Sequence, residues 1–167
     1  MTTRNLQTAD LCDEFGDLCT SCDLQFRQFG SHSSFFGRIR TVKCYDDNVL
    51  VRRAFETRSD GEVMIVDGAG FLGSALVGDQ MAALAISNGW AGIVICGALR
   101  DSVALCEMEI GVKALGTNPK KSGKKGTGES DVPVKFGNVV FRPGEWIYSD
   151  EDGILVSAKN LLQDKKL

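Results

Sequence analysis

Three consecutive stretches in the middle of the chain decide the fold: EVMIVDGAG at residues 62–70, GDQMAALAISN at 78–88 and WAGIVI at 90–95. The first and third are short apolar runs, which are typical of strands buried on both faces. The second places its apolar residues on one face of a helix and is followed by Gly89, which is typical of a helix end. A strand, a helix and a second strand in this order predict an α/β fold.

The sequence on either side predicts further elements. Thr8 is expected to cap a short helix that Gly16 ends. The lysine-rich stretch 118–130 is expected to be a flexible surface loop, with binding of anionic substrates or a partner by its lysine pairs 120–121 and 124–125 as the weaker alternative. The remaining predicted helices cover 48–55 and 102–108, with a short one closing the chain, and the remaining predicted strands cover 37–44, 110–115, 132–134, 139–141, 146–148 and 153–156. The pattern is α/β in the middle and antiparallel β at the end, which predicts mixed α/β layers.

Composition limits the class of protein. The chain has 167 residues, of which 43% are hydrophobic and 25% charged, as expected for one globular domain over residues 1–167. A net charge of −3 gives no reason to expect direct nucleic-acid binding. The longest apolar run, 90–99, is about half of the roughly 20 residues that a membrane-spanning helix needs. We expect a cytoplasmic protein, with a peroxisome-like organelle as a weaker alternative because the chain ends in Lys165-Lys166-Leu167.

Two motifs suggest cofactors but are incomplete. Residues 68–73 match G-x-G-x-x-G after a strand, yet the dinucleotide fingerprint also needs an immediate helix and an acidic residue at the end of the next strand. That strand ends near Cys96, with no acid until Asp101, so a tight turn is the favoured interpretation. Cys19 and Cys22 form a lone C-x-x-C, whereas a structural zinc site needs two further ligands.

A stronger functional pattern combines Asp79 with Arg100-Asp101. Ligands of open α/β sheets collect at the carboxyl ends of strands, so the loop after Val66, the helix start at Gly78 and the loop after Ile95 are expected to face one pocket. There, the amides at the helix start and the planar guanidinium of Arg100 could bind a carboxylate. The carboxylate of Asp101 could bind a hard cation. From residue types alone, however, a solvated loop or surface salt bridge is the commoner interpretation of an Arg-Asp pair.

Several motifs in order resemble the RraA-like family, which contains the bacterial regulator of ribonuclease activity A and the class II 4-hydroxy-4-methyl-2-oxoglutarate aldolases. The resemblance runs from about Leu11 to Val156, the expected core of the domain. The matching motifs are VMIVDG at 63–68, NGWAGIVI at 88–95, GALRD at 97–101, GTGESDV at 126–132 and DEDGILV at 150–156. Within the family, an Asp followed after twenty residues by Arg-Asp marks the aldolase branch, and Asp79 with Arg100-Asp101 meets that spacing.

The resemblance implies a fold, a reaction and an assembly. The fold is a swivelling β/β/α-type sandwich that forms a trimeric ring or a hexamer. The reaction is retro-aldol cleavage of 4-hydroxy-4-methyl-2-oxoglutarate-type keto-acids to pyruvate, with decarboxylation of oxaloacetate, through a metal-bound pyruvate enolate. The main alternative is a non-catalytic regulator that binds and inhibits an RNA-processing endonuclease. The intact Asp101 favours the enzyme, since the regulator carries a non-acidic residue at that position.

The same resemblance assigns residue roles. Amides of Gly78, Asp79, Gln80 and Met81, together with the Arg100 side chain, would hold the carboxylate of the keto-acid. Asp101 would bind a divalent cation, Mg²⁺ or Mn²⁺. Asp79 would support a base that takes the proton from the substrate hydroxyl, so that Asp79 and Arg100 are the expected catalytic residues.

Overall fold

The computed structural model describes residues 6–163 and contains four α-helices and twelve strands over that range. The helices are α1 (Thr8–Phe15), α2 (Val49–Phe55), α3 (Asp79–Ser87) and α4 (Ser102–Cys106), with a 3-10 turn at Gly16–Leu18. The strands are β1 (Thr20–Cys22), β2 (Arg27–Gln28), β3 (Phe35–Lys43), β4 (Val63–Asp67), β5 (Ala75–Val77), β6 (Gly92–Leu99), β7 (Gly111–Thr117), β8 (Glu129–Ser130), β9 (Val134–Phe136), β10 (Val139–Phe141), β11 (Trp146–Ser149) and β12 (Ile154–Ser157).

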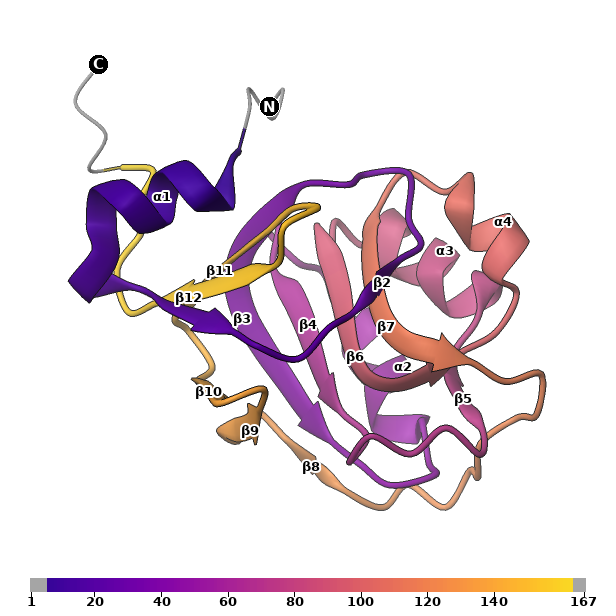
Figure 1. The fold of residues 1–167 in the computed structure, drawn as a ribbon. Helices are drawn as coiled ribbons and strands as arrows, with labels where there is room; N and C mark the ends of the chain where they lie inside the picture. The colour runs from indigo at the N-terminus through magenta and orange to yellow at the C-terminus, as the bar shows by residue number, and fades with distance from the viewer. Residues whose placement is uncertain (1–5, 164–167) are drawn as a thin grey trace.

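A parallel layer forms the centre of the molecule. Strands β3, β4, β6 and β7 lie side by side in parallel, and β5 adds to the end of β6. Every residue of β6 is buried, because helices cover one face of this layer and a second group of strands covers the other (Figure 1). The predicted βαβ unit is therefore confirmed as β4, α3 and β6.

An antiparallel layer continues from the same sheet. The first half of β3 pairs with β11, β11 pairs with β12, and β12 pairs with β1. The register places Arg38 opposite Trp146, whereas the next residue, Ile39, is already paired with Val63 of β4. One strand of nine residues thus belongs to both layers.

Three apolar clusters hold the layers together. The first lies between the parallel strands and helices α2, α3 and α4, and the second lies between the two groups of strands. The third packs α1 against β11 and β12 through residues such as Leu11, Tyr148 and Leu155 (Figure 1). This β/β/α layering confirms the expected fold class, while the ring-shaped assembly stays a prediction.

The ring of Phe35 lies over two glycines of neighbouring strands. A Cβ on Gly111 would lie 2.0 Å from the ring of Phe35, and one on Gly92 would lie 2.3 Å from it. Both glycines begin their strands, β7 and β6, and only a residue without a side chain leaves room for the ring there.

Several predicted boundaries are wrong. Strand β6 continues through 97–99, the first part of the loop expected at 97–101, because β5 and β7 supply hydrogen-bonding partners there. Strand β5 itself was not predicted. The predicted strand at 132–134 is shifted to Val134–Phe136, where it pairs with β10, and the helix predicted at 102–108 ends at Cys106.

The two ends of the chain also differ from expectation. Gln7, not Thr8, occupies the cap position of α1, and Thr8 instead donates hydrogen bonds to Asp150 from its amide at 2.6 Å and its hydroxyl at 2.7 Å. Residues 161–163 form a turn, and the rest of the predicted closing helix, like the Lys165-Lys166-Leu167 ending, lies outside the described residues. Within residues 6–163, no helix is both long and apolar enough to span a membrane.

The glycine-rich stretch 68–73 forms a tight turn. The amide of Phe71 donates to the carbonyl of Gly68, and the amide of Gly68 donates to the carbonyl of Cys96. The stretch leads into β5, and the next helix begins only at Asp79. The turn interpretation is confirmed, and the strand-to-helix junction that a dinucleotide site requires does not form here.

Candidate active site

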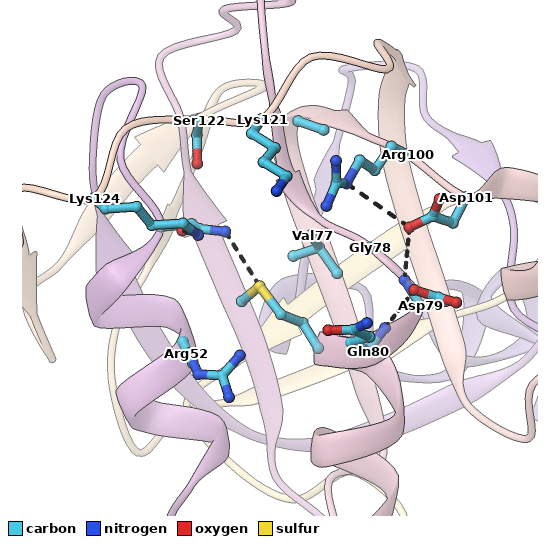
Figure 2. A pocket seen from close by; sticks show the side chains of 13 residues that line it. Arg52, Val77, Gly78, Asp79, Gln80, Arg100, Asp101, Lys121, Ser122 and Lys124 are labelled. Carbon is cyan, nitrogen blue, oxygen red and sulfur yellow. Dashed lines mark hydrogen bonds and ion pairs between the residues drawn. The ribbon is translucent and has the colours of Figure 1, made fainter.

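A cavity of about 380 Å³ lies where β5 and β6 end and α3 begins. Gly78, Asp79, Gln80, Met81, Arg100 and Asp101, all of the residues predicted to form the site, line it. Figure 2 shows Arg100 and Asp101 on one side of this cavity and Arg52 and Lys124 on the other.

The ends of two strands bring the predicted residues together. Strand β5 runs beside β6, and the amide of Arg100 donates to the carbonyl of Val77 at 3.0 Å. This contact fixes the start of α3 against the end of β6. Twenty residues separate Asp79 from Arg100 in the sequence, yet the two segments are neighbours because β5 and β6 are paired and parallel.

Asp101 has an unusual backbone conformation. It lies in the left-handed region with φ of 57° and ψ of 38°, directly between β6 and α4. A non-glycine residue in this region is strained, and such strain is concentrated at functional sites. The backbone turn directs the Asp101 side chain back to the helix start, where its Oδ2 accepts from the amide of Asp79 at 3.3 Å and lies 3.8 Å from Nε of Arg100.

The helix start is occupied by the protein's own carboxylates. Besides the contact between Asp101 and the Asp79 amide, Oδ1 of Asp79 accepts from the amide of Gln80 at 2.7 Å. Negative groups are favoured at this position because the first amides of a helix have no partner within the helix and its dipole is positive there. An incoming carboxylate would therefore compete with Asp79 and Asp101 for the same amides.

Three further cations of the cavity were not assigned to the site from the sequence. Arg52 comes from α2, and Lys121 and Lys124 come from the stretch 118–130, which was interpreted as a solvated loop. Nζ of Lys124 donates to Oδ1 of Asn48 at 2.5 Å. Burial lowers the pKa of Lys124, and the positive charges of Arg52 and Arg100 lower it further. The run of lysines was the only feature of the sequence that pointed to Lys121 and Lys124. The residues that they meet in the fold, such as Asn48, are distant in the sequence.

One predicted part of the pocket is missing. The loop after Val66 was expected to face the same pocket, but the cavity is lined instead by β5, through Ala75 and Val77. Asp67 and Ala69 of that loop line a separate depression beside Tyr45. The insertion of β5 between the loop and the helix explains the difference.

The donor atoms suit one kind of metal site. Among residues 6–163, no group of three or more His, Cys, Asp and Glu side chains could enclose a metal ion. The cavity does offer two carboxylates, Asp79 and Asp101, and the Asp101 side chain is 39% exposed. Mg²⁺ commonly uses one or two carboxylates and completes its shell with water and substrate oxygens. The residues present fit such an open site and do not fit a closed cage.

Comparison with known proteins extends over nearly the whole chain. The sequence model of the RraA-like family, described as Aldolase/RraA, matches residues 8–156. A structure from Geobacillus kaustophilus HTA426, named S-adenosylmethionine:2-dimethylmenaquinone methyltransferase, is 46% identical with a TM-score of 0.94, and the match covers 96% of this chain and 100% of that one. The RNA-processing inhibitor RraA from Thermus thermophilis is 42% identical with a TM-score of 0.90, covering 93% of this chain and 94% of that one. Streptomyces coelicolor RraAS2, at 24% identity and a TM-score of 0.71 over 91% of this chain and 81% of that one, shares the fold.

Proposed function

Because the chain belongs to the RraA-like family, we propose that it is a divalent-metal-dependent lyase that releases pyruvate from short 2-keto diacids. The substrates are 4-hydroxy-4-methyl-2-oxoglutarate-type acids, cleaved by a retro-aldol reaction, and oxaloacetate, which is decarboxylated. The observation that carries this proposal is the convergence of Arg100, Asp101 and the start of α3 in one cavity.

The charge of the cavity supports an acidic substrate. Arg52, Arg100, Lys121 and Lys124 line it together with two carboxylates. Cations that converge in a partly enclosed space raise the local concentration of anions and strengthen their binding. A keto diacid carries two carboxylates, which these opposed walls would attract at both ends.

Arg100 and the helix start would bind the keto-acid end of the substrate. The planar guanidinium of Arg100 can donate two parallel hydrogen bonds to a carboxylate, and it keeps its charge throughout the physiological pH range. On binding, the substrate carboxylate would take over the amides of Asp79 and Gln80 from the protein's own carboxylates. This exchange would free the oxygens of Asp79 and Asp101 for the reaction.

Asp101 would hold Mg²⁺ or Mn²⁺, and such an ion, when bound, supplies Lewis-acid polarisation of the 2-keto oxygen, where the electrons of the broken carbon–carbon bond collect. Asp79 would accept the proton of the substrate 4-hydroxyl through a water molecule during the retro-aldol reaction. Decarboxylation of oxaloacetate needs no such base, so it should depend on Asp79 less than cleavage does.

A coupled assay tests the proposal. Pyruvate release from oxaloacetate and from 4-hydroxy-4-methyl-2-oxoglutarate is followed with lactate dehydrogenase and NADH, with Mg²⁺, with Mn²⁺ and with EDTA. We expect turnover only with a metal ion. Asp101→Asn, which keeps the side-chain shape, should abolish it, whereas Asp60→Asn, at an exposed position outside this cavity, should not. Full activity in EDTA, or in Asp101→Asn, would refute the metal role.

A regulatory function is the second candidate, because one 42% identical protein is described as an RNA-processing inhibitor. Its test is inhibition of RNA cleavage by a purified RNA-processing endonuclease. Inhibition that persists in Asp101→Asn, together with no pyruvate release by the unmodified protein, would favour this candidate over the lyase.

We do not extend the methyltransferase name to this chain. The sequence feature most typical of a nucleotide-cofactor site, the stretch 68–73, leads into a strand and lies outside the cavity.

We also propose that the lyase forms a trimer or hexamer in the cytoplasm. Light scattering of the purified protein measures this assembly.

A further inference from the structure

We infer that Asp46, Asp47 and Asn48 form a clamp that holds the lysine-bearing segment 121–126 beside the cavity, and that Asp47 and Asn48 are positioning residues for substrate binding. Residues 46–48 are far from 121–126 in the sequence, which assigned no role to the first segment and favoured a solvated loop for the second. The part played in substrate binding rests on the proposed function, whereas the clamp itself follows from the contacts below.

The two segments are joined through their backbones. The amide of Gly123 donates to the carbonyl of Asp46 at 2.7 Å, and the amide of Asn48 donates to the carbonyl of Gly123 at 3.4 Å. Asp47 and Gly123 form a parallel bridge. A Cβ on Gly123 would lie only 2.7 Å from the carbonyl oxygen of Asp46, so the close approach requires glycine.

The carboxylate of Asp47 fixes two further residues of the segment, Lys125 and Gly126. It is 2% exposed, and its Oδ2 accepts from the amides of Lys125 at 2.5 Å and Gly126 at 3.0 Å. Its Oδ1 accepts from the amide of Val49 at 3.1 Å, which ties the contact to the start of α2. Burial by itself would raise the pKa of Asp47, but the hydrogen bonds from the backbone outweigh burial and lower it. The carboxylate therefore stays charged, and a buried charge requires such partners.

Asn48 fixes the lysine side chain. It is 6% exposed, and its Nδ2 donates to the carbonyl of Leu76 at 3.0 Å and lies 3.2 Å from Sδ of Met81. These contacts orient the amide so that Oδ1 is directed at Lys124, from which it accepts a hydrogen bond. Since Leu76 belongs to β5 and Met81 to α3, Asn48 places Lys124 relative to the same elements that carry the helix start.

The clamp opposes electrostatic repulsion. Four cations line the cavity, and like charges in a shared space repel one another. Lysine side chains on an unanchored segment would move outward into solvent, where their charges are better hydrated. The contacts of Asp46, Asp47 and Asn48 hold the segment in place before any anion is bound, which reduces the ordering that binding would otherwise require.

Trypsin tests the clamp without reference to activity, because the segment contains three lysines, Lys121, Lys124 and Lys125. In the full-length protein, Asp47→Ala should accelerate cleavage after Lys124 and Lys125 by about tenfold or more, the ratio expected for the loss of one charge-assisted hydrogen bond. Gly123→Ala should also accelerate it, because its Cβ would lie 2.7 Å from the carbonyl oxygen of Asp46. The matched control is Asp131→Ala, which removes a bidentate pair with Arg40 at the far end of the same connection. Unchanged cleavage in both clamp variants would overturn the clamp, whether or not the protein turns over a substrate.

Steady-state kinetics test the positioning role. We expect Asp47→Ala and Asn48→Ala to raise KM for oxaloacetate about tenfold and to change kcat by less than about twofold, because only binding contacts on the far wall are lost. A variant that merely unfolds in part would show a lower kcat with an unchanged KM. That result, or an unchanged KM in variants that trypsin cleaves faster, would overturn the positioning role. Failure of the unmodified protein to release pyruvate would instead reject the proposed function and leave the trypsin result to decide the clamp.

Discussion

Gly78→Ala gives a sharp test of the site, because the glycine faces the two residues that define it. A Cβ at position 78 would lie 2.6 Å from Oδ2 of Asp101, 3.3 Å from Cγ of Arg100 and 3.4 Å from its Nε. An ordinary contact begins at 3.4 Å, so the Asp101 carboxylate would have to move by the difference, about 0.8 Å. A displacement of about 1 Å at a reacting group can reduce the rate about 100-fold.

The same substitution should leave stability nearly unchanged. Gly78 has φ of −136° and ψ of −171°, an extended conformation that alanine adopts without strain. Replacing glycine by alanine at a helix cap lowers the free energy of unfolding by at most about 1 kcal/mol. Alanine also restricts the backbone of the unfolded chain, which raises the free energy of unfolding by about 0.4–1 kcal/mol. We therefore expect a change in Tm of no more than a few degrees, since about 1 kcal/mol shifts Tm by roughly 2–4 °C in a domain of this size.

The experiment compares pyruvate release and thermal unfolding for Gly78→Ala and a control, Gly116→Ala. The control adds a Cβ inside β7 that would meet only Leu72, at 3.8 Å, an ordinary contact. The prediction is about 100-fold lower kcat/KM in Gly78→Ala and little change in the control. Near-normal activity of Gly78→Ala would refute the assignment of Asp101 to the reaction, and so would an activity loss matched by an equal loss in the control.

Three further outcomes are expected. Arg100→Lys keeps the charge but loses the planar fork, so kcat/KM for oxaloacetate should fall about 10–100-fold, and an unchanged value would remove Arg100 from carboxylate binding. Burial and neighbouring positive charges lower the pKa of Lys124 below 10.5, so this side chain should lose its charge, and KM should rise, as the pH approaches 10.5 from neutrality. The variant Lys124→Arg keeps its charge, so its KM should not change over the same pH range. The same dependence of KM on pH in both proteins would contradict this prediction. Thr8→Val removes a buried hydrogen bond to the Asp150 carboxylate, and urea unfolding should show a loss of about 2 kcal/mol without a change in KM.

The central elements were predictable because their signals are local. The strands expected at 62–66 and 90–95 and the helix expected between them follow directly from residue pattern, and the structure confirms all three as β4, β6 and α3. Strand β5 was not predictable in this way, because its three residues form a strand only through pairing with the end of β6. The same pairing extends β6 to Leu99, into the stretch 97–101 that was expected to be a loop.

The candidate site also combines residues that the sequence could identify with residues whose place depends on distant parts of the chain. Asp79, Arg100 and Asp101 were identified from spacing and family resemblance, and the structure brings them into one cavity, while their roles remain to be tested. A solvated loop was the favoured interpretation of Lys124, because its place beside the cavity depends on Asn48, which lies 76 residues away in the chain. A charge run alone cannot indicate whether its side chains face solvent or a cavity. That distinction depends on a buried amide whose orientation is fixed by two other elements.

Strand β3 pairs with both the antiparallel and the parallel layer, and this affects how the chain folds while it is synthesised on the ribosome. Residues 39–43 find their partner in β4, about 24 positions later, whereas residues 35–38 pair with β11, more than 100 positions later. The parallel half can therefore assemble early, while the first half of β3 presents an open edge until β11 has been synthesised. Newly made chains that stall before Trp146 should accordingly be the species most prone to aggregate or to engage chaperones.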